Sequence, residues 1–342
     1  MVKQLLNTLY VQRQGSYVHL HQDAVSVVAD GERLLRVPLH HIGAIGLFGN
    51  VSVSPFLIHR CSEDGRVINW FTETGRFMGR LSGPTHGNVL LRQAQYRMVE
   101  NDSQTLALAK IIVAGKLQNS KVQILRTIRD HGDPAGILEK SVEQLDGLLG
   151  QVDEAGDLDT VRGIEGRGAA VYFHSFSAMI RVDDGAFKWS GRNRRPPRDP
   201  INALLSFGYA LLTVECASAL EGVGLDPQAG YLHAIKPGRP ALALDLAEEF
   251  RSIMVDRMVL AMVNRRQLQA DDFIQHPGGA VVLTDAARRT FLEEYQRRKR
   301  EEVTHPLLQD KVPMGLLMHV QARLLARYIR GDAPVYRPYV AR

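Results

Sequence analysis

Ser82-Gly83-Pro84-Thr85-His86-Gly87 is the stretch that decides the fold, because the hydrophobic pattern of the chain changes across it. Before this stretch, apolar and polar residues alternate with the period of two that is typical of strands. After it, apolar residues recur every three or four positions, as in helices. Its glycines and proline are typical of a linker. The sequence therefore predicts an α+β protein, with a small β-rich N-terminal domain at 1–85 followed by a larger all-α C-terminal domain at 86–342.

Turn and cap signals support strands upstream of the linker. Asp30-Gly31 lies between the apolar runs 24–28 and 34–39, and both residues tolerate the positive φ angles of a tight hairpin turn. Ser54 suits the N-cap of a short helix that begins at Pro55. Further strands are predicted at 17–21, 66–71 and 76–81.

Helical periodicity extends over most of the chain downstream of the linker. Helices are predicted at 88–131, 136–154, 159–181, 200–223, 240–267, 285–300 and 306–330. With 342 residues, of which 45% are hydrophobic and 23% charged, the chain is long enough to bury a core in each of two domains. Disorder is therefore not expected over most of its length.

The cysteine usage and the hydropathy of the chain indicate where the protein works. Cys61 and Cys216 form no C-x-x-C pair, so neither a disulfide framework nor a zinc ribbon is predicted. The first 14 residues lack the apolar core of a signal peptide, and no segment is predicted to span a membrane. We therefore expect a soluble, cytoplasmic protein with no membrane partner.

The charge of the chain favours a polyanionic partner without establishing one. The formal net charge is +5 and the isoelectric point is about 9.2. The densest basic stretch runs from Arg192 to Arg198, and its prolines stiffen a loop whose arginines suit phosphate contacts. The alternative is a solvated loop between helices. The candidate DNA-binding residues are Lys188, Arg192, Arg194, Arg195 and Arg198, with Trp189 as a candidate for base stacking.

Two carboxylates interrupt a segment that is otherwise apolar. Residues 240–250 are apolar on nearly every side of a helix, which predicts that this helix is buried. Asp245 and Glu248 are three positions apart, so both lie on one helix face. A buried carboxylate is unfavourable unless it is paired or binds a cation, and two neighbouring carboxylates also repel each other. A divalent metal ion would remove both problems.

Two further side chains are candidates for the same metal site. His233 precedes the loop 234–239, which is long enough to bring the imidazole back to the helix face that carries Asp245 and Glu248. Glu165 lies in the segment 162–170, where glycine and alanine dominate. Small side chains permit another helix to approach closely, and a glutamate placed there can reach across to it.

Each of these residues also has a simpler interpretation. Asp245 and Glu248 can instead form buried ion pairs with Arg239 or Arg251. Glu165 can be a surface residue on a loosely packed helix, and His233 can be a satisfied loop histidine. Spacing alone leaves the metal site and the ion pairs as open alternatives.

A series of motifs follows the order that is found in one known family. The motifs are Arg162-Gly163-Ile164-Glu165-Gly166, then Arg195-Pro196-Pro197-Arg198-Asp199-Pro200-Ile201-Asn202-Ala203-Leu204-Leu205-Ser206-Phe207-Gly208-Tyr209, Gly230-Tyr231-Leu232-His233, Ala243-Leu244-Asp245-Leu246-Ala247-Glu248-Glu249-Phe250-Arg251 and Gln321-Ala322-Arg323-Leu324-Leu325-Ala326-Arg327-Tyr328. Together they resemble the CRISPR-associated endonuclease of spacer acquisition, the Cas-one integrase family, over essentially the whole chain. The opening Leu5-Leu6-Asn7-Thr8-Leu9-Tyr10-Val11 is most similar to the subtype I-C branch.

The resemblance implies a site and a division of labour between the domains. The N-terminal domain is expected to dimerise and to dock a partner, and the helical domain is expected to bind metal and DNA. The metal-binding and catalytic residues of the family fall on Glu165, His233 and Glu248, with Mg²⁺ or Mn²⁺ as the cofactor. Family members often have aspartate in place of Glu248. Asp245 matches a nearby acidic position that either binds the metal directly or supports its ligands.

The resemblance also implies an activity and partners. The expected activity is the insertion of short foreign DNA segments, as new spacers, into a CRISPR array by 3′-hydroxyl transesterification. The expected partners are double-stranded DNA, a second copy of the chain and the small second CRISPR-associated protein, and the I-C branch adds a Cas-four type nuclease as a candidate. Two alternatives are a metal-dependent nuclease of branched DNA repair intermediates and a non-catalytic DNA-binding scaffold.

Overall fold

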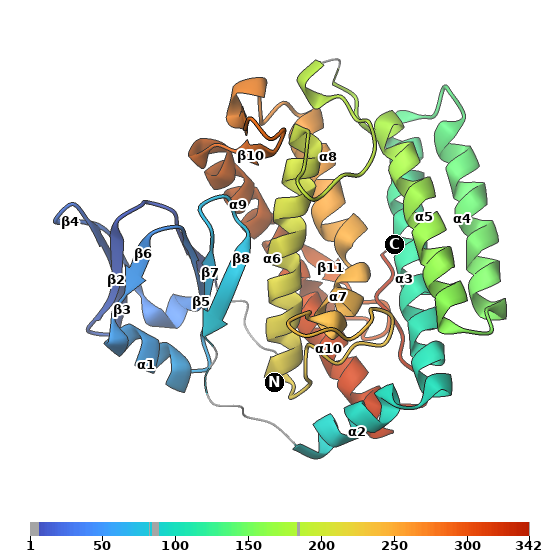
Figure 1. The fold of residues 1–342 in the computed structure, drawn as a ribbon, viewed down its shortest axis with the longest axis horizontal. Coiled ribbons are helices and arrows are strands. Elements are labelled where there is room, and N and C mark those ends of the chain that lie inside the picture. Colours follow the sequence, from blue (N-terminus) through green and yellow to red (C-terminus); the bar gives the residue numbers. More distant parts are fainter. Residues whose placement is uncertain (1–6, 82, 84–88, 183–184, 342) are drawn as a thin grey trace. The chain divides into compact units, whose positions relative to one another are not determined.

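A computed structural model describes residues 7–81, 83, 89–182 and 185–341 (Figure 1). The predicted linker at 82–87, apart from Gly83, therefore lies outside the described residues. The chain divides into two compact units, Met1–His86 with Leu283–Arg300, and Gly87–Val282 with Glu301–Arg342. This division differs from the predicted boundary between 85 and 86 in that the helix at 285–300 groups with the first unit.

The first unit contains two four-stranded β-sheets. One has the order β1-β5-β7-β8, in which β1, β5 and β7 are parallel and β8 is antiparallel to β7. The other has the order β4-β3-β2-β6, in which β2, β3 and β4 are antiparallel and β6 is parallel to β2. The elements are β1 (Asn7–Val11), β2 (Ser16–His21), β3 (Ala24–Ala29), β4 (Glu32–Pro38), β5 (Ile42–Phe48), β6 (Val51–Val53), α1 (Pro55–Glu63), β7 (Val67–Phe71), β8 (Phe77–Leu81) and α9 (Asp285–Arg300).

Local sequence explains two of the connections in this unit. Asp30 and Gly31 have φ angles of 52° and 80° and join β3 to β4, which confirms the predicted hairpin. Ser54 Oγ accepts a hydrogen bond from Leu57 N at 3.2 Å, and Pro55 begins α1, which confirms the predicted cap.

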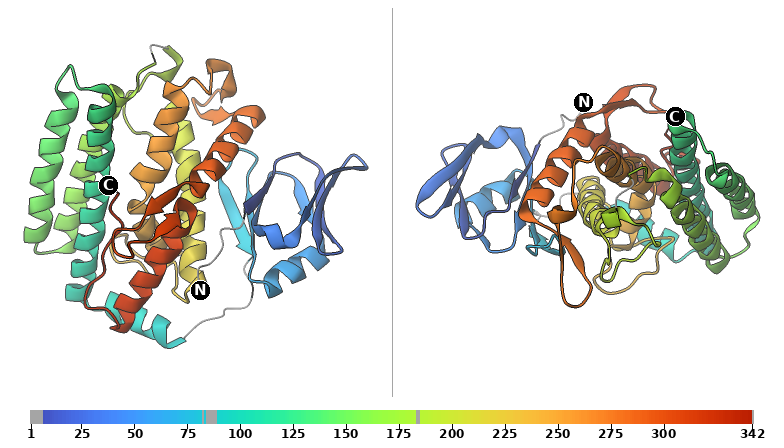
Figure 2. Two further views of the ribbon diagram at one scale, coloured as in Figure 1. Left: turned by 180° about the vertical axis from the view of Figure 1, so that it is seen from behind. Right: turned by 90° about the horizontal axis from the view of Figure 1, so that it is seen from above.

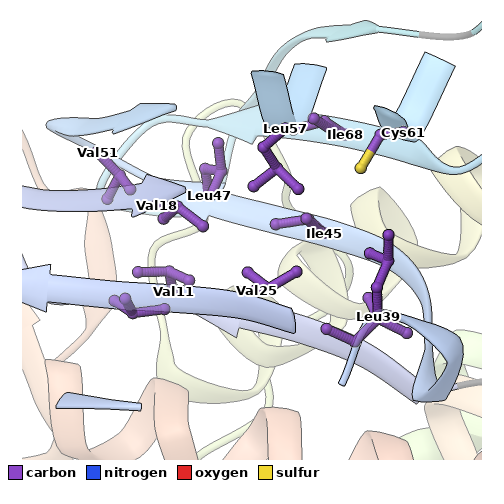
Figure 3. Close-up of a cluster of buried hydrophobic side chains, with 12 residues drawn as sticks. Val11, Val18, Val25, Leu39, Ile45, Leu47, Val51, Leu57, Cys61 and Ile68 are labelled. Carbon is purple, nitrogen blue, oxygen red and sulfur yellow. The ribbon is translucent and has the colours of Figure 1, made fainter. Parts of the chain in front are cut away.

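A hydrophobic core lies among the two sheets and α1 (Figure 3). Val18 and Val25 come from one sheet, and Ile45 and Leu47 come from β5 in the other; all four side chains are fully buried. Cys61 of α1 covers the same core. Burying each large apolar side chain contributes about 1.5–3 kcal/mol relative to leaving it exposed. The alternation that predicted strands therefore also predicted which residues fill this core.

The second unit is mostly helical. Its helices are α2 (Val89–Val99), α3 (Asp102–His131), α4 (Ile137–Glu154), α5 (Leu158–Met179), α6 (Pro200–Gly222), α7 (Ala241–Glu248), a π-helix (Arg251–Asp256), α8 (Arg257–Asn264) and α10 (Met314–Arg330). Two short two-stranded sheets interrupt the helices, β9 (Phe273–Gln275) with β10 (Val281–Leu283) and β11 (Glu302–Thr304) with β12 (Lys311–Pro313). The C-terminal part is therefore predominantly, but not entirely, α-helical as predicted.

Three predicted helices were wrong in extent. The segment 88–131 is broken before α3, where Asn101 Oδ1 accepts a hydrogen bond from Gln104 N at 3.0 Å and so caps a new helix. The segment 240–267 is divided into α7, the π-helix and α8. The segment 306–330 becomes helical only at Met314, because β11 and β12 precede it.

Helix α5 approaches α3 closely at one glycine. A Cβ atom on Gly168 would overlap the side chain of Leu117 of α3, so a larger residue there would require Leu117 to move. Gly163 and Gly166 have no such neighbour within 4 Å. The close approach predicted for this segment is therefore confirmed at Gly168. Helices α3, α4 and α5 pack side by side, as the two views in Figure 2 also show.

Helix α6 corrects the prediction that no segment is apolar enough to span a membrane. By length and composition Pro200–Gly222 passes that test, with a mean hydropathy of 1.6 over its most apolar window. However, 67% of this window is buried inside the protein. The helix packs against α7, α8 and α10, so its apolar character is explained by its place in the core.

Candidate active site

Four side chains from three helices and one loop meet in the helical unit. Glu165 comes from α5, Lys116 from α3, Glu248 from the last position of α7, and His233 from the loop before α7. Lys116 Nζ contacts Glu165 Oε1 and lies 2.8 Å from Glu248 Oε2. His233 Nε2 lies 3.9 Å from Glu248 Oε1. The three residues that were predicted as metal ligands therefore lie in one cluster, in which the Lys116 ammonium contacts both carboxylates and His233 lies beside Glu248.

Opposite charges stabilise one another in this site. The side chain of Glu248 is only 2% exposed, and burial by itself raises its pKa. Arg251, Lys116 and His233 outweigh burial and hold the pKa below its usual range. Burial lowers the pKa of Lys116, but the attraction of Glu248 and Glu165 outweighs burial, so this pKa is raised. Both groups are thus charged at neutral pH. Arg251 Nη1 lies 3.1 Å from Glu248 Oε1, so the ion pair of the simpler interpretation is also present.

Asp245 orients His233. Its Oδ1 accepts a hydrogen bond from His233 N at 3.0 Å and lies 2.7 Å from His233 Nδ1. Its Oδ2 accepts hydrogen bonds from Tyr231 N at 2.6 Å and from Leu232 N at 3.1 Å. A carboxylate with these contacts favours the tautomer with the proton on Nδ1, which leaves the lone pair of Nε2 toward Glu248. This geometry favours a supporting role for Asp245 over direct metal binding.

The donor atoms of the site fit a divalent cation. Glu248 Oε2 is buried, and the Lys116 ammonium lies 2.8 Å from it. With Glu165 Oε1 and His233 Nε2 it offers two carboxylate oxygens and one imidazole nitrogen, which suit Mn²⁺ and, less typically, Mg²⁺. Within the described part of the chain, no three His, Cys, Asp or Glu side chains are arranged as a ready ligand set. At this site the Lys116 ammonium contacts both carboxylates.

The two consecutive glutamates at the end of α7 serve different sides of the helix. Glu248 faces the site, whereas Glu249 is fully buried and accepts hydrogen bonds from Gln321 Nε2 at 3.0 Å, Tyr339 N at 2.9 Å and the Tyr336 hydroxyl. Tyr336 and Tyr339 belong to the segment that follows α10. This C-terminal segment therefore holds the residue next to a candidate ligand, and the π-helix that follows is a form often found at functional sites.

A second buried carboxylate lies behind Arg251. The Tyr209 hydroxyl donates a hydrogen bond to Asp256 Oδ1. The guanidinium carbons of Arg251 and Arg192 lie 5.0 Å and 5.4 Å from the centre of the Tyr209 ring. Burial raises the pKa of Asp256 to about 6, although the tyrosines and arginines around it oppose this rise. These four residues are up to 64 positions apart, so no local pattern in the sequence indicates the cluster.

Asp256→Asn is expected to remove a pH dependence of stability between about pH 4 and pH 6. The pKa of Asp256 rises from its ordinary 3.8 to about 6 in the folded protein, so the folded state binds this proton more tightly than the unfolded chain. The stabilisation is therefore complete below about pH 4 and is lost, by about 3 kcal/mol, as the pH rises through 6. Urea unfolding of both proteins at about pH 4 and pH 7 measures this change as a difference between them. A difference that does not change with pH would mean that folding does not raise the pKa of Asp256.

The predicted DNA-binding loop exposes some of its basic residues and uses one internally. Lys188, Arg194, Arg195 and Arg198 are exposed. Arg192 turns inward, and its guanidinium donates hydrogen bonds to Asn202 Oδ1 at 2.6 Å and to Ser206 Oγ at 3.1 Å. Arg192 therefore stabilises the shape of the loop, and its guanidinium is already used in these internal hydrogen bonds.

Two further residues fix the form of this loop. Asn202 is fully buried and also accepts a hydrogen bond from Asn193 N at 3.1 Å, while its Nδ2 donates to Gly191 O at 2.8 Å. The indole of Trp189 donates to Phe173 O at 2.8 Å and packs against Phe176. Trp189 is half-buried and its indole is held by these contacts, so stacking on DNA bases stays a prediction.

The sequence matches one family model over most of its length. The model of the CRISPR associated protein Cas1 matches residues 9–297. A CRISPR-associated endonuclease Cas1 of Moorella thermoacetica is 49% identical over 340 residues, which cover 99% of each chain. A CRISPR-associated exonuclease Cas4/endonuclease Cas1 fusion of Geobacter sulfurreducens is 38% identical over 337 residues, which are 98% of this chain and 60% of that relative.

Solved structures share the fold. A casposase bound to integration product has a TM-score of 0.85 and 21% identity, covering 97% of this chain and 93% of that chain. A chain of a Cas6-RT-Cas1–Cas2 complex has a TM-score of 0.82 and 22% identity, covering 99% of this chain and 37% of that chain. At these identities the likeness shows the fold alone. It confirms the predicted class, an N-terminal β-rich region followed by a mostly helical region.

Proposed function

Because the chain belongs to the Cas1 family of CRISPR-associated endonucleases, we propose that it is a metal-dependent integrase that inserts short foreign DNA segments into a CRISPR array. One observation carries the proposal: Lys116 contacts both Glu165 and Glu248, and His233 lies 3.9 Å from Glu248, although these residues are far apart in sequence. The oxygen and nitrogen atoms of Glu165, Glu248 and His233 suit a divalent cation. The casposase structure that shares this fold is bound to an integration product, so an integrase activity is compatible with the fold.

A short series of contacts connects the predicted DNA-binding loop, residues 192–198, to the proposed site. Arg251 pairs with Glu248 and lies over the ring of Tyr209, and Arg192 lies over the same ring. The exposed arginines that follow Arg192 are therefore suited to hold the DNA backbone near the carboxylates. Backbone contacts of this kind give affinity that falls with salt.

The proposed reaction is a transesterification. The 3′ hydroxyl of the incoming DNA attacks a phosphodiester at the repeat boundary; a new phosphodiester forms, and the 3′ oxygen of the cut strand leaves and takes up a proton. A bound Mg²⁺ or Mn²⁺ supplies Lewis-acid polarisation of the phosphate and balances developing charge. Glu165, Glu248 and His233 would hold this ion, and Asp245 keeps the imidazole in the required orientation.

An integration assay tests the proposed function. The purified protein and its small partner are incubated with short duplexes and a supercoiled plasmid that carries a repeat, with Mn²⁺ or Mg²⁺ and with chelator. Joined products that require the metal are expected. A branched-DNA cleavage assay in parallel tests the repair-nuclease alternative. Cleavage without joining would favour that nuclease, and DNA binding without any metal-dependent reaction would favour a scaffold.

Asp245→Asn is expected to weaken Mn²⁺ binding by about 10- to 100-fold. An amide in place of the carboxylate turns an N–H group toward the backbone donors of Tyr231 and Leu232 or toward His233, so the imidazole loses its fixed orientation. Isothermal titration with Mn²⁺ measures the loss, and Asp159→Asn on the surface of α5 is a control that should bind normally. Unchanged affinity of Asp245→Asn would remove Asp245 from the site.

Replacing Arg194, Arg195 and Arg198 together by alanine is expected to weaken DNA binding uniformly across sequences. Each lost phosphate contact lowers the slope of log affinity against log salt by about 0.9, so the slope should fall by about 2 to 3. Fluorescence anisotropy at several salt concentrations measures it. The matched control is Arg129→Ala, whose side chain is 68% exposed at the end of α3 and should change neither affinity nor slope.

The proposed partners follow the same family assignment. The Geobacter relative joins a Cas4 exonuclease to a Cas1 endonuclease, and the structural relative belongs to a complex that contains Cas2. We propose that this protein works as a homodimer with double-stranded DNA, the small second CRISPR-associated protein and a Cas4-type nuclease, in the cytoplasm. Assignment to the subtype I-C branch stays a prediction. Size-exclusion chromatography of the protein with each purified partner tests the assembly.

A further inference from the structure

Lys116 occupies the centre of the candidate metal site. It lies on α3 with its side chain only 12% exposed, and its ammonium contacts Glu165 Oε1 and lies 2.8 Å from Glu248 Oε2. Glu165 and Glu248 are also two of the residues that would hold the metal ion of the proposed function. The other oxygen of Glu248, Oε1, lies 3.1 Å from Arg251. Lys116 therefore contacts both carboxylates, whereas Arg251 pairs with the other oxygen of Glu248.

We propose that Lys116 is a built-in competitor of the metal ion, holding the two carboxylates together in the metal-free protein and leaving its position when Mn²⁺ or Mg²⁺ binds. The proposal rests on the metal site in the proposed function and adds a resident cation that limits metal affinity. An ammonium and a divalent ion cannot share the space between the same two oxygens. Metal binding must therefore include the displacement of Lys116.

The chemistry of the two cations explains why Lys116, and not Arg251, is the displaceable one. Lysine carries a compact charge on a flexible four-carbon chain, so its ammonium can withdraw without disturbing the helix. Arg251 is held by its ion pair with Glu248 and by its position over the Tyr209 ring. Arg251 therefore remains beside Glu248 when the metal ion replaces the Lys116 ammonium.

The need for a resident cation follows from the burial of the carboxylates. Glu248 is almost fully buried and Glu165 is 28% exposed, so without a positive charge between them they would repel each other in a medium of low dielectric constant. That repulsion acts between α5 and the end of α7. Lys116 removes it before metal arrives, which keeps the site folded but makes the metal compete for it.

The test compares Lys116→Met with the wild-type protein, using Mn²⁺ alone as the probe. Methionine keeps a similar length and removes the charge. Two measurements are made on the full chain: the Kd for Mn²⁺ by isothermal titration, and the melting temperature with and without Mn²⁺. Lys121→Met is the matched control, because Lys121 is on the same helix but pairs with Asp146 outside the site. Lys116→Arg keeps the charge and serves as a second variant.

Removal of the competitor is expected to tighten Mn²⁺ binding by about tenfold or more. Without metal the variant should melt at a lower temperature than the wild type, and Mn²⁺ should raise its melting temperature by more than it raises that of the wild type. Lys121→Met should match the wild type in Kd. Lys116→Arg should bind Mn²⁺ no more tightly than the wild type. If Lys116→Met folds only when Mn²⁺ is present, that also supports the proposal.

Two outcomes overturn the proposal, and they separate it from the proposed function. Suppose that Glu165→Gln abolishes Mn²⁺ binding, but Lys116→Met binds Mn²⁺ no more tightly than the wild type. The metal site is then supported, and the role of Lys116 as a competitor is wrong. A melting temperature lowered equally with and without Mn²⁺ leads to the same conclusion, because it assigns Lys116 a purely structural role. If neither protein binds Mn²⁺ in a Glu165-dependent way, the metal site and the competitor both fall.

Discussion

Glu165→Gln is expected to lower strand transfer by about a thousandfold while DNA affinity stays within about twofold of the wild type. Glutamine keeps the size and shape of the side chain but loses the negative charge that a divalent cation needs. Glu165 reaches the site from α5, where its Oε1 contacts Lys116, whereas the exposed arginines of the DNA-binding loop are on a different segment. The chemistry and the binding should therefore separate.

Two measurements make this result interpretable. Joined product is quantified on a repeat-bearing plasmid, and DNA affinity is measured by anisotropy under the same conditions. Asp159→Asn is the matched control, because this carboxylate is on the same helix but 90% exposed. Normal integration by Glu165→Gln would show that the proposed ligand set is wrong, even though the three side chains lie close together.

A chain that ends at Ala333 is expected to lose about 5 kcal/mol or more of its free energy of unfolding. The removed segment includes Tyr336 and Tyr339, which are 2% and 3% exposed. Both donate hydrogen bonds to Glu249, and Asn119 Nδ2 of α3 donates to Tyr339 O at 2.7 Å. Without the segment, buried polar groups lose their partners as well as their apolar cover. Urea unfolding followed by circular dichroism measures the loss.

Single substitutions divide this large effect into parts. Tyr336→Phe removes one hydroxyl from Glu249 and should cost about 1–3 kcal/mol. Val335 is 45% exposed, so Val335→Ala should change stability little. Because Glu249 adjoins Glu248, truncation should also weaken Mn²⁺ binding. A truncated chain with wild-type stability would show that the segment only rests on a core that is complete without it.

Much of the fold could be predicted because its signals are local. The turn at Asp30-Gly31 and the cap at Ser54 depend on residues within a few positions, and both were confirmed. The breaks in the long helical segments were missed because apolar periodicity continues through them. Asn101 ends one such run with a side-chain cap, and the π-helix after α7 keeps an apolar pattern while changing its hydrogen bonds. Apolar periodicity indicates which face of a helix is buried, but it does not indicate the pattern of backbone hydrogen bonds.

The candidate site could be predicted only in part. The carboxylates were visible because charge is unusual in an apolar helix, and the glycine-rich segment at Glu165 signalled close packing. Lys116 was missed, because it is one of three lysines in the 30-residue helix α3 and its position alone suggests a residue on the polar face. Its partners lie 49 and 132 positions further along the chain. Interactions between such distant residues leave no periodic signal, so only the folded structure brings them to view.

Helix α9 gives the protein an interleaved order of synthesis. The chain leaves the first unit at His86 and returns to it only at Leu283, so almost 200 residues emerge from the ribosome in between. Arg288 of this helix lies over the ring of Phe48, and Arg300 donates a hydrogen bond to Asn7 Oδ1 at 2.8 Å. The first strands to be synthesised can therefore make these contacts only after α9 has also been synthesised. For the same reason, no single continuous fragment of the chain contains the β-rich unit with all of its contacts.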